Sequence, residues 1–304
     1  MTQSNMPHHN PPRRATSMAE LAEKGNEFVT EAGRQYWRAF QPRPSDVFIS
    51  PAAKCGTTWT QQIVHGLRTR GAMDFPEITA VTPWLELAYD LGLDLENPYP
   101  VQPRVYKSHL SWPDIPKGGR YIIVVRNPKD ALVSLYRFFE GWWFEPGTIS
   151  MTTFARERYM AGRHEGGYWH HLASWWEQRR AENVLLLCFE DMKVDLPSTV
   201  RAIAPFIGVD LDDELLELVV RQSSLEFMKA HQRQFDDHLV AEIRGPACGI
   251  PPGDSSKVRN GQVGDHRYEL PPQISQEMDD IWAELIGSRF GFESYEALRA
   301  ALQE

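Results

Sequence analysis

Apolar positions follow two alternating patterns along the chain. Short apolar runs with the composition of β-strands are separated by longer segments in which apolar residues recur every three or four positions, as in helices. The runs predict strands at residues 46–50, 104–107, 121–125 and 184–189. Strands that alternate with helices are typical of βα units on a parallel sheet. The pattern therefore predicts one α/β domain over residues 18–304, with a central parallel sheet flanked by helices.

Two of the predicted helices follow strands directly. The first carries apolar residues at four-residue spacing from Trp59 to Leu67. The second begins at Pro128, with Asn127 as its cap and Asp130 in its first turn, where a carboxylate is favourable. Further helices are predicted at residues 153–160, 168–180, 198–207, 212–221, 224–232 and 273–286.

Two segments show no clear period. Residues 234–264 are rich in Gly and Pro and predict a long loop, and such loops are usually functional or disordered. Residues 1–17 are polar and predict a disordered N-terminal extension. The apolar runs are far too short to span a bilayer, and the N-terminus has no apolar signal core.

Composition narrows the classes of partner. The 304 residues carry a formal net charge of -9, so we expect no nucleic-acid partner, since a duplex-binding surface needs a basic excess. Cys55, Cys188 and Cys248 are too few and too scattered for a disulfide framework, which favours the cytoplasm. We predict no metal site, because the histidine pairs lack Cys or carboxylate residues at metal-ligand spacing.

The segment after the first strand has the features of an oxyanion site. It reads PAAKCGTTW and opens a helix, whose first free N–H groups and positive dipole end attract anions. Gly56 allows close backbone approach, Lys54 adds a point charge, and Thr57 and Thr58 add hydroxyl donors. The Lys precedes the Gly, so the segment is P-loop-like but is not the nucleoside-triphosphate loop GxxxxGK[ST]. The alternative is a plain strand-to-helix turn with a solvated lysine.

Polar residues also follow two other strands, at the sheet edge where α/β proteins bind ligands. Arg126 directly follows the strand 121–125, and Ser134 lies two helical turns further on. The two side chains together are suited to bind a phosphate. Lys107 is the last residue of the strand 104–107, and His109 follows two positions later. A neutral imidazole can remove a proton from a hydroxyl. The alternatives are an Arg and a Ser on a capped helix end, and a structural or surface histidine.

In their order and spacing these pieces resemble the cytosolic sulfotransferases, which use 3′-phosphoadenosine 5′-phosphosulfate (PAPS) as sulfuryl donor. Residues 51–59 are similar to that family's TYPKSGTTW loop, residues 107–109 to its KTH motif, and residues 126–134 to its RNxKDxxxS signature. Residues 257–265 resemble its RKGxxGDW motif more loosely. The likeness runs from about residue 48 to residue 265 and implies a PAPS-dependent enzyme that needs no metal.

The resemblance also implies donor-binding roles. Lys54 would contact the 5′-phosphate and the bridging oxygen, Trp59 would stack on the adenine, and Arg126 and Ser134 would hold the 3′-phosphate. The implied donor-binding residues are Lys54, Cys55, Gly56, Thr57, Thr58, Trp59, Arg126, Ser134, Phe189, Ser223, Leu225, Val258, Arg259, Asn260 and Gly261. The chain departs from the family at Cys55 (usually Ser), Phe189 (Tyr), Leu225 (an aromatic residue) and Asn260 (Lys).

The same likeness implies a mechanism of in-line displacement. His109 would be the base, Lys107 would stabilise the sulfuryl group, and Lys54 would neutralise the leaving oxygen. Candidates for the acceptor pocket are Phe138, Trp142, Trp143, Phe144 and Trp169. Phe138 matches an acceptor-lining position of the family, and the others are chosen for their proximity in sequence. Apolar and aromatic walls suit a phenol or a hydrophobic alcohol.

Two other functions stay open at this point. A P-loop-type small-molecule kinase would need a GK[ST] loop, and a non-catalytic module would bind the bisphosphate nucleotide without turnover. Residues 267–272 do not match the motif through which family members often dimerise, so the oligomeric state is open as well.

Overall fold

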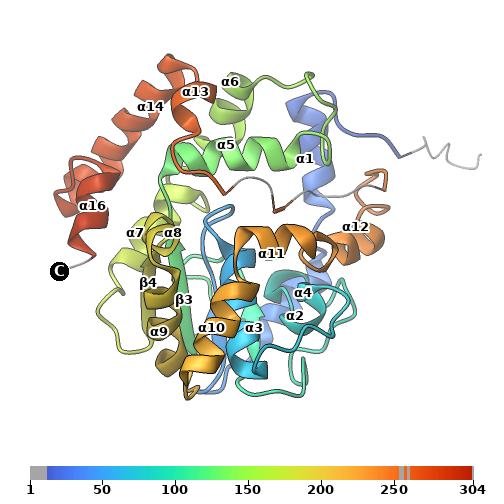
Figure 1. Cartoon of the computed structure of the whole chain (residues 1–304). Helices are drawn as coiled ribbons and strands as arrows, with labels where there is room; N and C mark the ends of the chain where they lie inside the picture. The colour runs from blue at the N-terminus through green and yellow to red at the C-terminus, as the bar shows by residue number, and fades with distance from the viewer. Residues whose placement is uncertain (1–11, 253–256, 259–260, 303–304) are drawn as a thin grey trace, which may run out of the picture.

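The computed structural model describes residues 12–252, 257–258 and 261–302, and Figure 1 shows the whole chain. Within these residues four parallel strands form one sheet in the order β2-β1-β3-β4. The strands are β1 (Val47–Ile49), β2 (Val105–Lys107), β3 (Arg120–Val125) and β4 (Val184–Cys188). The predicted α/β class is confirmed, and so are the four predicted strands.

Helices cover both faces of the sheet. The main helices are α1 (Met18–Asn26), α2 (Glu31–Ala39), α3 (Thr57–Thr69), α5 (Pro128–Phe139), α7 (Tyr168–Trp176), α8 (Phe189–Val194), α9 (Leu196–Phe206), α10 (Asp213–Gln222), α11 (Leu225–Ala230), α12 (His238–Arg244), α14 (Pro272–Trp282) and α16 (Tyr295–Ala301). Short elements are α4 (Ile78–Val81), α6 (Met151–Phe154), α13 (His266–Glu269), α15 (Ser288–Phe290), 3₁₀ turns at Leu85–Leu87 and Gln232–Gln234, and π-helical turns at Ala155–Tyr159 and Ala283–Gly287. None of the described helices is long and apolar enough to cross a membrane.

Two apolar layers sandwich the sheet. On one face α3, α9 and α10 bury residues such as Ile63, Ile203 and Val219 against β1 and β3. On the other face Trp175 of α7 and residues of the α2 region pack on Tyr106 and Tyr121. The strands are buried on both sides, which explains why their sequences are apolar throughout.

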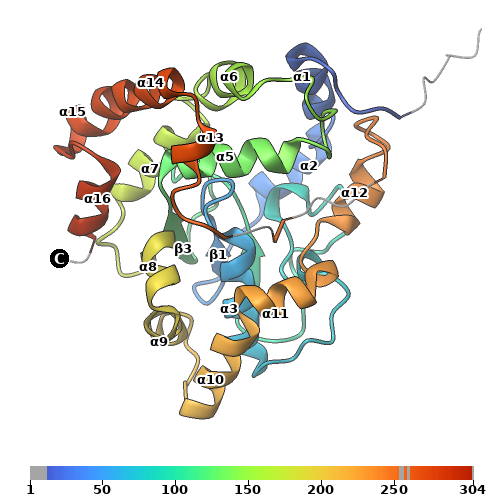
Figure 2. The ribbon, with the colours of Figure 1, turned by 45° about the horizontal axis from the view of Figure 1, so that its top comes forward.

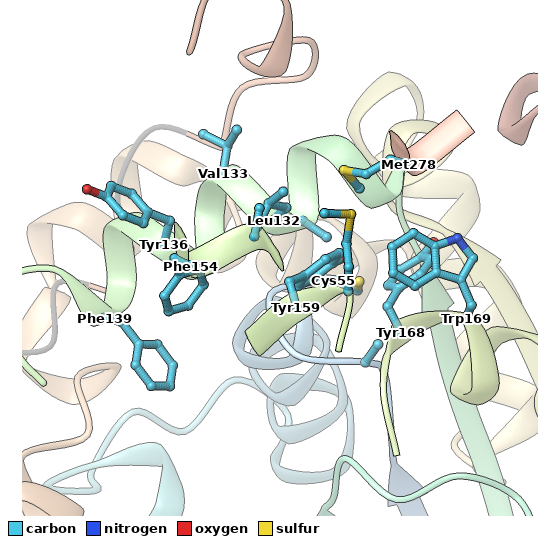
Figure 3. Packing of buried hydrophobic residues seen from close by; sticks show 14 of the residues in the cluster. Cys55, Leu132, Val133, Tyr136, Phe139, Phe154, Tyr159, Tyr168, Trp169 and Met278 are labelled. Atoms are coloured by element: carbon cyan, nitrogen blue, oxygen red, sulfur yellow. The ribbon is translucent and has the colours of Figure 1, made fainter. Parts of the chain in front are cut away.

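A third layer covers the edge where the strands end. Figures 1 and 2 show α5, α6 and α14 gathered above this edge. In Figure 3, Leu132 and Tyr136 of α5 share a core cluster with Phe154, Trp169 and Met278. The functional loops at the strand ends therefore lie between a rigid sheet and a packed helical layer.

The structure corrects the predicted loop at 234–264. This stretch contains α12, a helix of seven residues held by tertiary contacts. Its Leu239 N–H donates to Glu77 Oε2 at 2.7 Å, and Arg244 donates to backbone carbonyls of the α1–α2 connection. So short a helix depends on such contacts, which periodicity does not reveal.

Differences also occur at segment ends. Phe189, predicted as the last strand residue, begins α8. Ala15 falls in the predicted disordered extension, yet it is buried and its N–H donates to Trp143 O at 2.9 Å. Residues 1–11 lie outside the described residues, and 18–304 as domain bounds stay a prediction.

Candidate active site

The loop between β1 and α3 has a special backbone conformation. Lys54 and Gly56 have φ angles of 65° and 101°, in the left-handed region. A Cβ on Gly56 would lie 3.1 Å from the Phe189 ring, so both the backbone conformation and the available space favour glycine. Thr57 begins α3, and its buried Oγ1 has no hydrogen-bond partner among the described residues. The loop thus presents free donors at a helix start, as an oxyanion site requires.

Arg126 connects this loop to two other segments. Its Nη1 donates to Lys54 O at 2.9 Å, and its Nη2 donates to Gln262 O at 3.0 Å. The guanidinium carbon lies 4.3 Å from the centre of the Phe189 ring. Its Nε is buried without a partner among the described residues, so the side chain keeps a donor for a ligand.

Asp130 anchors the C-terminal loop that follows residue 260. Its carboxylate accepts hydrogen bonds from Gly264 N at 2.7 Å, His266 N at 3.1 Å and His266 Nδ1 at 2.7 Å. Burial favours the neutral acid, but the hydrogen bonds from His266 and Gly264 outweigh burial and lower the Asp130 pKa. The sequence alone indicates Asp130 only as a helix-start residue, whereas in the structure it fixes a loop that lines the site.

Aromatic and small residues form the other end of the site. Trp59 Nε1 donates to Ser223 O at 2.8 Å, and its ring lies 5.6 Å from that of Phe189, edge to face. Ser223 Oγ is buried without a partner among the described residues. Leu225 lies 3.8 Å from the place of a Cβ on Gly261. These residues form a mostly apolar part of the cavity lining, which suits a heterocyclic base.

His109 is held at the end of β2 by two hydrogen bonds. Its Nδ1 lies 2.8 Å from Pro51 O, and its backbone N–H donates to Glu86 Oε1 at 2.8 Å. A carbonyl oxygen only accepts, so Nδ1 carries the proton and Nε2 keeps its lone pair. Burial, and after it the Lys107 charge, lower the pKa of His109 to about 3. The imidazole is therefore neutral, with the lone pair of Nε2 left to accept a proton.

Two lysines near His109 are also desolvated. Burial, followed by the neighbouring Lys257 charge, lowers the pKa of Lys54 to about 7. Burial lowers the pKa of Lys107 to about 7 as well, although Asp237 opposes the shift. Lys107 Nζ lies 3.5 Å from the centre of the Trp84 ring, and Lys54 Nζ lies 4.2 Å from that of Phe138. Such cations gain strongly from a bound anion.

One cavity of about 790 Å³ unites these groups. Its lining includes these predicted residues: Lys54, Gly56, Thr57, Thr58, Trp59, Lys107, His109, Arg126, Ser134, Phe138, Trp142, Trp143, Phe189, Ser223, Leu225, Val258 and Gly261. The lining also contains residues that sequence analysis did not select, among them Phe28, Trp84, Asp237 and Lys257. No motif marks Phe28, Trp84 or Asp237, because they come from separate loops and helices. Lys257 opens the segment 257–265 that loosely resembles a family motif, but the resemblance implied no role for it.

Three predicted residues do not line the cavity. Cys55 is buried beside Tyr159 in the core cluster, and burial raises its thiol pKa to about 12 (Figure 3). Trp169 is buried against Tyr159 and Tyr168, and Phe144 is buried in the same cluster. Being close in sequence to a site did not place these aromatic rings at its surface. Arg259 and Asn260 lie outside the described residues.

Comparison with known proteins identifies the class of site. Residues 44–289 match the sulfotransferase domain family. The chain belongs to the sulfotransferase family. It is 32% identical over 256 residues to an amine sulfotransferase of Oryctolagus cuniculus, covering 81% of this chain and 82% of the relative. It is 31% identical over 269 residues to sulfotransferase 1B1 of Canis lupus familiaris, covering 83% of this chain and 88% of the relative.

Solved structures of sulfotransferases share the fold. The mouse sulfotransferase SULT7A1 complexed with PAP matches with a TM-score of 0.67 and 21% identity, over 91% of this chain and 94% of that one. Retinol dehydratase in complex with androsterone and the inactive cofactor PAP matches with a TM-score of 0.68 and 19% identity, over 90% of this chain and 95% of that one. The resemblance seen in the sequence is thus confirmed.

This sulfotransferase uses PAPS as its sulfuryl donor. The kinase and the non-catalytic module are not favoured. The cavity fits such a donor chemically, because Thr57 Oγ1, Arg126 Nε and Ser223 Oγ are buried polar atoms without partners among the described residues. In the same part of the chain no group of three or more His, Cys, Asp or Glu residues could hold a metal ion.

Proposed function

We propose that this sulfotransferase modifies the hydroxyl of a small aromatic or hydrophobic acceptor, with His109 as general base. The observation that carries the proposal is the state of His109. Its imidazole is neutral, with the proton on Nδ1 engaged by Pro51 O and Nε2 available as a base. The residue lines the same cavity as the phosphate loop, so base and donor site share one space.

The acceptor side of the cavity is aromatic. The Trp84 ring lies 5.3 Å from His109 and 5.7 Å from Phe28, which lies 5.2 Å from Trp143. Phe138 and Trp142 form a further edge-to-face pair at 4.9 Å. Rings in this arrangement favour an apolar, planar ligand next to the base.

The donor roles follow from the same cavity. The backbone at Gly56, the hydroxyls of Thr57 and Thr58 and the Lys54 ammonium would hold the 5′-phosphosulfate. Arg126 and Ser134 would hold the 3′-phosphate. The adenine would lie against Trp59 and Phe189, next to Leu225. The departures from the family at Phe189 and Leu225 keep this region apolar.

The chemical step assigns one task to each group. His109 Nε2 takes the proton of the acceptor hydroxyl, whose oxygen forms a bond to sulfur. The bond between sulfur and the bridging phosphate oxygen breaks, and its electron pair stays on that oxygen, which Lys54 neutralises. Lys107 stabilises the sulfuryl oxygens. Positioning and electrostatics therefore supply the catalysis.

A transfer assay tests the proposal. The protein is incubated with sulfur-radiolabelled PAPS and a panel of phenols, steroids, aliphatic alcohols and sugars. We expect transfer to an aromatic or hydrophobic alcohol, and a loss of about a hundredfold or more in His109→Ala, the range of general-base catalysis. The control is His170→Ala, which removes a histidine that does not line the cavity. Near wild-type turnover in His109→Ala would refute the base assignment.

The panel also includes amines without a hydroxyl, because one relative is named an amine sulfotransferase. Transfer to amines alone would replace the hydroxyl in this proposal. The cytoplasm stays our predicted location, in keeping with three free thiols.

A further inference from the structure

Asp237 joins two lysines of the cavity at one oxygen atom. The carboxylate lies at the start of α12 and is 1% exposed. Its Oδ1 accepts a hydrogen bond from Lys257 Nζ and lies 3.9 Å from Lys107 Nζ. The side chain of Lys257 is only 7% exposed, and it lines the cavity. A segment 150 positions beyond Lys107 therefore brings a further ammonium group to the reaction centre.

The charge of Lys257 affects three groups of the cavity. After burial, its charge is the largest influence that lowers the pKa of Lys54. It also lowers the pKa of Lys107 and, more weakly than burial and Lys107, that of His109. A charge acts on all three groups only from a short distance, because Coulomb energy falls with separation. These effects agree with the contacts that place Lys257 beside Asp237, the carboxylate next to Lys107.

The local charges do not cancel. Among the described residues at this point, Lys54, Lys107 and Lys257 face the single well-ionised carboxylate Asp237, whose pKa the lysines lower in spite of burial. Two other buried carboxyl groups, Glu77 and Glu86, have pKa values raised first by burial, which weakens their negative charge. A buried surplus of positive charge is costly unless an anion binds there.

We propose that Lys257 is a further catalytic residue, which donates to the sulfuryl oxygens, and that Asp237 is the residue that positions it. An ammonium has three N–H donors, so the hydrogen bond to Asp237 leaves two for a ligand. The sulfuryl group carries three oxygens that no bond-making or bond-breaking step consumes. Lys257 transfers no proton: His109 takes the acceptor proton, and the electron pair of the broken bond stays on the bridging oxygen. This inference rests on the sulfuryl-transfer mechanism proposed above.

The test compares a ligand that has the sulfuryl group with one that lacks it. In Lys257→Met, calorimetry should give a PAPS affinity about tenfold or more below wild type and a PAP affinity within about twofold of it. The single-turnover rate should fall about tenfold or more, and Lys257→Arg should restore part of it. The matched control is Lys229→Met, which removes an exposed lysine outside the cavity.

Equal losses of PAPS and PAP affinity, or no loss of either, would overturn the role of Lys257. Failure of the broader mechanism is distinguishable, since it would show as no transfer by the wild-type protein. The comparison of PAPS with PAP binding needs no acceptor and still tests Lys257 in that case.

Asp237→Asn tests the positioning role through pH dependence. Removing this carboxylate deprives Lys54 and Lys107 of a charge that raises their pKa values, so both pKa values should fall further. The pH at which PAP affinity begins to decline should then move to lower pH than in wild type. A purely structural role would lower affinity without moving that pH, and this result would overturn the assignment.

Discussion

The contacts of His109 fix its tautomer and its charge. Pro51 O requires a proton on Nδ1, while burial and the neighbouring lysines disfavour a second proton. The sequence motif predicted the residue but not this state, which depends on a carbonyl 58 positions away. The motif likewise implied a donor-binding role for Cys55, although this residue is buried in the core cluster. Side-chain direction at loop residues is set by packing, which a one-dimensional pattern does not contain.

The state of His109 gives a prediction at the residue scale. In the donor-free protein the ring should remain neutral, with the proton on Nδ1, from pH 8 down to at least pH 5. Protonation is expected only near the lowered pKa of about 3. Nitrogen NMR of labelled histidine, assigned with His109→Ala, measures both properties. Titration of this ring near pH 6.5 would contradict the desolvated environment described here.

At the scale of elements, the strands and helices that could be predicted from the sequence were those with a regular pattern of apolar residues. Strands β1 to β4 and the long amphipathic helices α3, α5 and α10 were predictable, because each buries a regular apolar face. The N-terminal helices α1 and α2 and the short helix α12 were missed. These elements depend on partners that are distant in sequence, as Arg244 of α12 does on the carbonyls of Glu27 and Phe28. Asp237, which directly precedes α12 and lines the cavity, was therefore missed with it.

The connection between α5 and the C-terminal loop can be tested through Asp130. Asp130→Ala removes the acceptor for three hydrogen bonds and leaves buried donors unpaired, at a cost of about 1–3 kcal/mol. The loop that carries Gly261 and Gln262 should loosen, and PAP affinity should fall about tenfold, as measured by calorimetry.

Asp279→Ala is the matched control for this variant. Asp279 forms an exposed ion pair with Lys129 at 2.7 Å, which contributes about 1 kcal/mol at most. Unchanged PAP affinity in Asp130→Ala would mean that the loop holds its position without this carboxylate.

At the scale of the whole molecule, the central cavity is lined by basic residues although the chain as a whole is acidic. The chain carries -9 overall, yet its central cavity collects Lys54, Lys107, Arg126 and Lys257. The net charge argued against a basic nucleic-acid surface, but it could not reveal this internal cluster. The order of motifs along the chain predicted that the phosphate loop, Arg126 and His109 converge. It could not predict Asp237, because α12 was not foreseen.

The basic residues of the cavity lead us to predict that the protein takes up protons when it binds the donor nucleotide. In the free protein the pKa values of Lys54 and Lys107 are about 7, so much of each side chain is neutral at pH 7.5. A bound phosphate stabilises the ammonium forms and raises both pKa values. The complex then holds more protons than the free protein above about pH 7, and by linkage PAP affinity should fall as pH rises through this range.

Calorimetry at pH 7.5 in two buffers of different ionisation enthalpy measures the uptake directly. Lys54→Met should reduce the number of protons taken up, and binding heats independent of the buffer would show that the lysines are already fully charged before the donor arrives.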